Sequence, residues 1–191
     1  YINKKSKSTF RKKPYKKNLF IFGSLFGFGF YLSGISWITN SLTFDENFKA
    51  LIPFAFVLIP LFLSLFVGFV TLLIGPFLNY NFSSILLFSG SFALSDYIRS
   101  KVLSGFPWNL WGYSWSWFPE ILQILNPIGL FAFNLLTITF FTVPAYLLFK
   151  KSLISKFLTI SLMFLVIFSI YLYGTFTINK NKVLLNYIKK I

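Results

Sequence analysis

The sequence has no cysteine and no histidine among its 191 residues. Without cysteine, these residues can form no disulfide, no thiolate-bound metal site and no cysteine nucleophile. Without histidine, the side chain that most often serves as general base or metal ligand is missing as well. Acidic side chains are also scarce, with four Asp and Glu against 18 Lys and Arg. We therefore predict no cofactor, no metal site and no catalytic residue within the chain.

Charge is scarce in general: 12% of the residues are charged and 56% are hydrophobic, whereas soluble domains are about a quarter charged. We predict an all-α integral membrane protein, a bundle of about five transmembrane helices with an aromatic-rich outer loop. The net charge of +14 suggests nucleic acid at first, but eight of the 18 cations lie in the first 17 residues. Such a flank is typical of a cytoplasmic anchor, so we predict no nucleic-acid partner.

Long apolar runs divide the chain into a basic cytoplasmic arm (1–17), a transmembrane helical domain (18–175) and a polar end (176–191). A run of about 20 apolar residues can cross the hydrocarbon core of a bilayer. Five spans are expected, at about 18–39, 51–74, 81–98, 127–149 and 157–173. The chain begins with Tyr1, so we expect a piece of a longer protein. Residues 176–191 would be a linker toward a missing periplasmic domain, with VLLNYI (183–188) opening a strand.

The distribution of charge predicts the orientation of the spans. With the basic arm in the cytoplasm, five spans place the basic turn at 150–156 inside as well. The acidic loop that carries Asp45 and Glu46, the aromatic loop and the C-terminus then lie outside.

Small and polar residues predict how individual helices begin and pack. Asn126 is expected to cap the fourth span, with Pro127 at its first position. Asn134 is expected to hydrogen bond to another helix. Three glycines lie on one face of the first span and are predicted to allow close helix packing: Gly23, Gly27 and Gly34.

The most unusual stretch is 96–117 (DYIRSKVLSGFPWNLWGYSWSW), here called the aromatic segment. It holds four of the five tryptophans. Trp and Tyr collect where hydrocarbon meets water, so we expect the segment at a membrane surface, with a turn at Gly105 and Pro107. Tryptophans crowded into one turn favour a wall that faces a substrate, while an interfacial belt is the alternative. Both interpretations stay open for Phe106, Trp108, Trp111 and Tyr113.

Two charged residues begin this segment. Asp96 and Arg99 lie three residues apart and can form an ion pair on one helical face. Asp96 as a general base is the alternative to this structural pair. Arg99 is expected at the outer membrane face, where its guanidinium can pair with a lipid phosphate or simply extend toward water.

Residues 104–115, SGFPWNLWGYSW, resemble a segment of apolipoprotein N-acyltransferases. That segment reads approximately Thr-Gly-Phe-Pro-Trp, two residues, and an apolar or aromatic residue before Gly-Tyr-Ser. Asp96, Tyr97 and Arg99 stand where the family tends to have an acid, an apolar residue and an arginine. Residues 27–41, GFGFYLSGISWITNS, are similar to the family's glycine-rich helix that ends in Trp and is followed by Ser. The resemblance covers roughly 18–148 and implies the membrane-helix half of the family.

The resemblance implies an enzyme that transfers a fatty acyl chain from phospholipid to the N-terminal diacylglyceryl-cysteine of lipoproteins, in the bacterial cytoplasmic (inner) membrane. In that family the chemistry is done by a C-terminal nitrilase-like domain, whose Glu-Lys-Cys set forms a thioester. The implied partners are a membrane phospholipid, a lipoprotein substrate and that domain of the same protein. The implied lipid-binding residues are Arg99, Phe106, Pro107, Trp108, Trp111 and Tyr113.

None of the Glu-Lys-Cys set is present, so we expect this chain to be inactive by itself. A different class of protein also fits the sequence. It is a non-enzymatic membrane protein, such as a transporter fragment or an assembly subunit, whose aromatic segment only anchors it at the interface.

Overall fold

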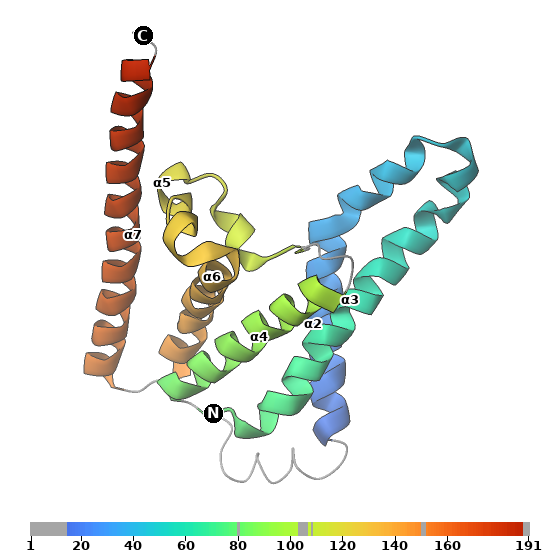
Figure 1. Ribbon diagram of the computed structural model, residues 1–191. Coiled ribbons are helices and arrows are strands. Elements are labelled where there is room, and N and C mark those ends of the chain that lie inside the picture. The colour runs from blue at the N-terminus through green and yellow to red at the C-terminus, as the bar shows by residue number, and fades with distance from the viewer. Residues whose placement is uncertain (1–14, 80, 103–106, 108, 150–151, 189–191) are drawn as a thin grey trace. The chain divides into compact units, whose positions relative to one another are not determined.

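The computed structural model describes residues 15–79, 81–102, 107, 109–149 and 152–188 (Figure 1). These residues form helices and short 3-10 turns, and no strand is present among them. The predicted all-α class is confirmed. The longer helices are α2 (Tyr15–Ile35), α3 (Ile52–Ile74), α4 (Phe82–Val102), α6 (Leu125–Phe149) and α7 (Leu153–Ile188). The shorter elements are η1 (Ser36–Thr43), η2 (Glu46–Leu51), η3 (Gly75–Phe77), η4 (Trp111–Trp115) and α5 (Pro119–Leu122).

Within the described ranges, four helical stretches are long and apolar enough to cross a membrane. They are Tyr15–Thr43, Glu46–Phe77, Leu125–Leu148 and Leu153–Lys182. Helix α4 has 21 residues but is not among them, because its serines and its charged end make it less apolar. The chain is therefore a multi-pass integral membrane protein.

The chain divides into two compact units. Unit 1 comprises Tyr1–Asn79 and Gly90–Asn109, and unit 2 comprises Tyr80–Ser89 and Leu110–Ile191. One boundary between the units lies within α4, between Ser89 and Gly90. Another lies within the aromatic segment, between Asn109 and Leu110.

In unit 1, α2 and α3 run side by side along their length (Figure 1). The contact depends on glycine: a Cβ at Gly23 would lie 2.9 Å from Cβ of Thr71, and one at Gly27 would lie 2.9 Å from Cβ of Val67. The Thr71 hydroxyl also donates to the carbonyl of Leu19 over 2.8 Å. Inside a membrane, van der Waals packing and interhelical hydrogen bonds replace the hydrophobic effect as the force that joins helices. Small residues at this face therefore decide that α2 and α3 pair.

In unit 2, α6 is interrupted near its start. Gly129 has φ 76° and ψ 168°, a backbone conformation that only glycine adopts readily. The predicted cap at Asn126 is wrong, because Asn126 and Pro127 lie inside the helical turn that begins at Leu125. The break that separates this turn from the spanning part of α6 is at Gly129. A core of Ile85, Val143 and Tyr146 then packs the spanning part of α6 against the first turns of α4.

Helix α7 extends well beyond the predicted span of 157–173. It runs from Leu153 to Ile188, so the predicted strand at 183–188 is wrong and these residues are helical. The chain passes through Gly174 without a break, and the hydroxyls of Thr175 and Thr177 donate to the carbonyls four residues earlier. With no proline in this range, the polar composition that suggested a linker does not end the helix.

Candidate functional site

The aromatic segment is the candidate site, and the structure describes most of it. Its first part, to Val102, completes α4, and its last part forms η4 and the turn that follows. Phe106 and Trp108, together with the predicted turn residue Gly105, lie outside the described residues. Of the other predicted lipid-binding residues, Arg99 and the half-buried Pro107 belong to unit 1, whereas Trp111 and Tyr113 belong to unit 2.

Asp96 and Arg99 form the predicted ion pair, and the pair is buried. Nη2 of Arg99 donates to Oδ1 of Asp96 over 3.0 Å. The Arg99 guanidinium also lies 5.3 Å from the ring centre of Tyr31 on α2, a cation–π distance. Arg99 is 0% exposed, so it does not extend to the surface of unit 1 as the sequence led us to expect. The pair therefore joins the end of α4 to α2, and its charges are kept from solvent.

Asn109 fastens the middle of the aromatic segment to α2. Its φ of 46° lies in the left-handed region, which asparagine tolerates better than most residues. Its Nδ2 donates to the carbonyl of Phe30 over 3.3 Å. Gly34 leaves room for this amide, because a Cβ there would meet the Asn109 side chain. Gly34, predicted to pack against another helix, thus faces Asn109, whereas Gly23 and Gly27 face α3.

In unit 2, Gly112 and Asn134 hold η4 against α6. The backbone N–H of Gly112 donates to Oδ1 of Asn134 over 3.1 Å, and both residues are buried. A Cβ at Gly112 would lie 3.1 Å from Cδ1 of Phe133, so a glycine lets η4 approach this closely. Asn134 was expected to bond to another membrane-spanning helix. In the structure its side-chain oxygen accepts a hydrogen bond from the backbone of the aromatic segment.

The tryptophans of the segment have different environments. The ring centres of Trp111 and Trp115 lie 6.0 and 6.2 Å from that of Phe141 on α6. Trp115 also contacts Phe140, with 5.6 Å between ring centres. By contrast, Tyr113 is 42% exposed and Trp117 is 87% exposed. Two tryptophans therefore pack on α6, while Tyr113 and Trp117 are more exposed.

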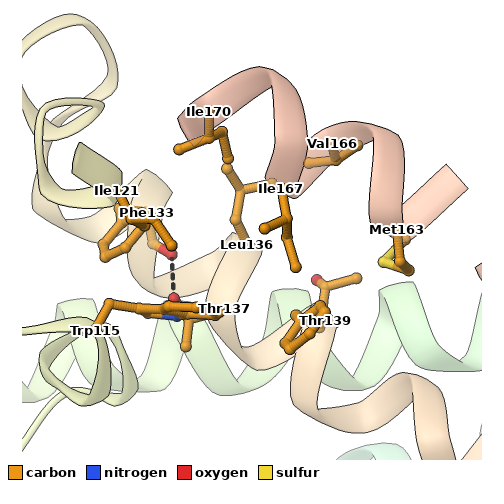
Figure 2. Close-up of a pocket in the computed structure, with 11 residues that line it drawn as sticks. Trp115, Ile121, Phe133, Leu136, Thr137, Thr139, Met163, Val166, Ile167 and Ile170 are labelled. Atoms are coloured by element: carbon orange, nitrogen blue, oxygen red, sulfur yellow. Dashed lines mark hydrogen bonds between the residues drawn. The ribbon is translucent and has the colours of Figure 1, made fainter. Parts of the chain in front are cut away.

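Trp115 also borders an apolar cavity of about 90 Å³ within unit 2. Figure 2 shows it beside Phe133 and Thr137 of α6, with Val166 and Ile170 of α7 on the far side. Sequence reasoning did not find this cavity, since α7 gives no periodic signal that points to it.

No three His, Cys, Asp or Glu side chains lie together in the part of the chain that the structure describes. The buried carboxylate of Asp96 is engaged by Arg99. Asn109 holds the segment to α2 within unit 1, and Gly112 holds it to α6 within unit 2.

The aromatic segment lies within a region of the chain that matches a known protein family. Residues 8–143, which contain all of it, match the family described as apolipoprotein N-acyltransferase N-terminal domain. The chain belongs to the apolipoprotein N-acyltransferase family. The resemblance noted in the sequence is thereby confirmed, and the glycine-rich run at 27–41 lies within the match as well.

Proteins named apolipoprotein N-acyltransferase are similar to this chain over most of its length. One from Brucella melitensis is 36% identical over 126 residues, which are 65% of this chain and 24% of the relative. One from Agrobacterium fabrum is 30% identical over 132 residues, which are 69% of this chain and 25% of the relative. One from Rickettsia prowazekii is 30% identical over 161 residues, which are 84% of this chain and 32% of the relative. The chain thus spans about a quarter to a third of these acyltransferases, and no solved structure matches it.

Proposed function

We propose that the chain is the membrane module of a bacterial apolipoprotein N-acyltransferase of the inner membrane. The whole enzyme would transfer a fatty acyl chain from phospholipid to the N-terminal diacylglyceryl-cysteine of lipoproteins. The observation that carries the proposal is the aromatic segment, which lies inside the family match and makes a part-buried hydrogen bond to α2 and a buried one to α6. Within each unit the contact holds the described part of the segment to a helix, which suits a surface that positions lipid.

The module would bind and position lipids, while a separate domain performs the chemistry. Acyl transfer through a covalent intermediate needs a nucleophile activated by a neighbouring group. The described residues offer hydroxyls and one buried, paired carboxylate at Asp96. A C-terminal nitrilase-like domain with a Glu-Lys-Cys set, which the family resemblance implies, would supply the nucleophile. The aromatic segment would face the side of the membrane on which that domain lies.

The exposed aromatic residues of the segment would contact the lipid substrates. Tyr113 is the described member of the predicted lipid-binding set with the most accessible ring. Its backbone neighbour Gly112 is tied to Asn134, so the ring projects from a fixed point. An amphipathic ring at a fixed point can order a lipid head group or the first carbons of a chain.

The test uses a full-length protein that includes this chain. Tyr113→Ala should slow acyl transfer about 2–10-fold, which is the loss of an aromatic contact of about 0.5–1.5 kcal/mol, with membrane abundance unchanged. Phe44→Ala is the matched control, because Phe44 is a fully accessible aromatic residue in another loop. Transfer is measured by mass spectrometry of a lipopeptide acceptor.

A fall in abundance with unchanged transfer per molecule would contradict the proposal. It would instead support the interpretation of the segment as an interfacial anchor. Equal loss of transfer for Tyr113→Ala and Phe44→Ala would also count against a role specific to this segment.

A further inference from the structure

The apolar cavity of unit 2 has no role in the function proposed above. It measures about 90 Å³ and lies between α6 and α7. A single water-sized group needs about 10–15 Å³ of such volume. The cavity therefore has room for several methylene groups, but not for a whole lipid or a large polar ligand.

The cavity lies between two places where α7 is held: Gly174 meets α5, and Met163 packs on the core of Ile85, Val143 and Tyr146. At Gly174 of α7 a Cβ would lie 2.8 Å from Cα of Glu120 and even closer to its carbonyl group. This glycine lets α7 touch the backbone of α5. Before Gly174 in α7, the side chains of Met163, Val166 and Ile170 line the cavity (Figure 2). Trp115 and Ile121 line the gap from η4 and α5.

The cavity is lined by apolar groups and by hydroxyls that are already hydrogen bonded, so it does not favour a polar ligand. Its two hydroxyl groups are satisfied within α6, since Thr137 donates to the carbonyl of Phe133 over 3.0 Å and Thr139 donates to that of Leu135 over 2.8 Å. The other side chains that line it are aliphatic or aromatic, apart from the Met163 thioether. None of the described residues that line it is charged. A polar head group placed there would lose its hydrogen bonds to water and gain none.

The surroundings identify the occupant. The stretch Leu153–Lys182 is apolar enough to span a membrane, and only 6% of its most apolar window is buried. Neighbours of the cavity on α7, such as Leu165, are exposed, and exposed apolar side chains of a membrane-spanning helix contact hydrocarbon chains. If the cavity were empty, the side chains that line it would lack van der Waals contacts on one side. An acyl chain that enters the cavity restores those contacts.

We propose that this cavity binds a segment of one acyl chain of a membrane phospholipid. Several methylene groups fill the gap between α6 and α7, and the rest of the chain lies along α7. Trp115 belongs to the aromatic segment, so an acyl chain in the cavity contacts that segment from its membrane side. The inference requires only that α6 and α7 lie in a bilayer. It does not depend on acyl transfer.

Photo-crosslinking in a defined bilayer tests the inference. The 191-residue chain is placed in nanodiscs of phosphatidylcholine doped with a phosphatidylcholine that carries a diazirine near the end of one acyl chain. After irradiation, mass spectrometry locates the adducts. We expect labelling at Met163, Val166 and Ile170 to exceed that at the outward-facing Phe164, Leu165 and Phe168 several-fold.

A pair of variants separates a site from general contact with lipid. Val166→Phe adds bulk at a side chain that lines the cavity and is 37% exposed. Leu165→Phe adds bulk at the next residue, which does not line the cavity and is 58% exposed. We expect Val166→Phe to lower labelling of Met163 and Ile170 several-fold, and Leu165→Phe to leave it unchanged.

Three outcomes would overturn the inference. One is uniform labelling around α7 in the unmodified chain, a result that needs no variant to fold. Another is equal labelling of Met163 in both variants. The third is labelling of the lining by a diacylglyceryl lipopeptide with the same photoreactive chain but not by the phospholipid. Because the assay uses no catalysis, failure of acyl transfer in the full-length enzyme leaves this result interpretable by itself.

Discussion

The side-chain oxygen of Asn134, in the middle of α6, accepts a hydrogen bond from the backbone N–H of Gly112 over 3.1 Å. Asn134 is 0% exposed, and its polar group would be costly in the apolar interior without a partner. The hydrogen bond satisfies both groups and fixes the aromatic segment to a membrane-spanning helix. The same bond places Trp111 and Trp115 against Phe141.

Asn134→Leu tests this contact. The substitution keeps a similar volume but leaves the Gly112 N–H buried without its acceptor, which should cost about 1–3 kcal/mol of unfolding free energy. Hydrogen exchange in the peptide that covers 110–116 should become faster. Thr139→Val is the control, because the Thr139 hydroxyl bonds only within its own helix. Unchanged exchange in Asn134→Leu would mean that η4 is held by its ring contacts alone.

The two ion pairs that the structure describes should differ sharply in their contributions. Asp96→Asn leaves the buried Arg99 without its carboxylate, and breaking a buried pair costs about 3–5 kcal/mol. Glu46→Gln removes the partner of Lys49 in a pair that is open to solvent, where the loss should be about 0–1 kcal/mol. The free energy of unfolding is measured by denaturant titration in detergent micelles. Equal losses for the two variants would show that Asp96 and Arg99 are not buried together.

Two glycines on α2 make a matched pair for helix packing. Gly27→Ala would place a Cβ 2.9 Å from that of Val67, and overpacking of this kind costs about 1–3 kcal/mol. Gly29→Ala meets no atom within 4 Å, and it should be neutral or gain roughly 0.5–1 kcal/mol from helix propensity. Thermal unfolding of the two variants in the same detergent gives the comparison. A similar loss in both would place α3 elsewhere than on the Gly27 face.

The absence of cysteine makes the orientation directly testable, because one introduced cysteine is then the only thiol in these residues. We expect Asn47→Cys and Ser116→Cys to react with a membrane-impermeant thiol reagent in intact spheroplasts, and Ser152→Cys to react only after lysis. All three positions are exposed in the structure. The expectation follows from the basic arm at 1–17, which the positive-inside rule assigns to the cytoplasm. Labelling of Ser152→Cys before lysis would reverse the orientation.

Several features of the fold follow from local sequence alone. The helices at 52–74 and 82–102 begin within a residue or so of the predicted runs, because a long apolar run in a membrane must satisfy its backbone hydrogen bonds internally. The pairing of Asp96 with Arg99 follows from a spacing of three residues on a helix. Composition could not show how far α7 continues, since Lys180 and Lys182 allow a helix as readily as a linker.

Other features depend on which residues meet in space. The sequence by itself determined the all-helical membrane class and the family, because both depend on composition or on residues close together in the chain. Only the tertiary structure decided that Gly34 faces Asn109, that Asn134 holds Gly112, and that Gly174 keeps α7 on α5 and leaves a cavity beside α6. Each of these contacts joins residues more than 20 positions apart. Whether a glycine or an asparagine is buried against a helix, a turn or lipid depends on backbone approach, which no local pattern of residues encodes.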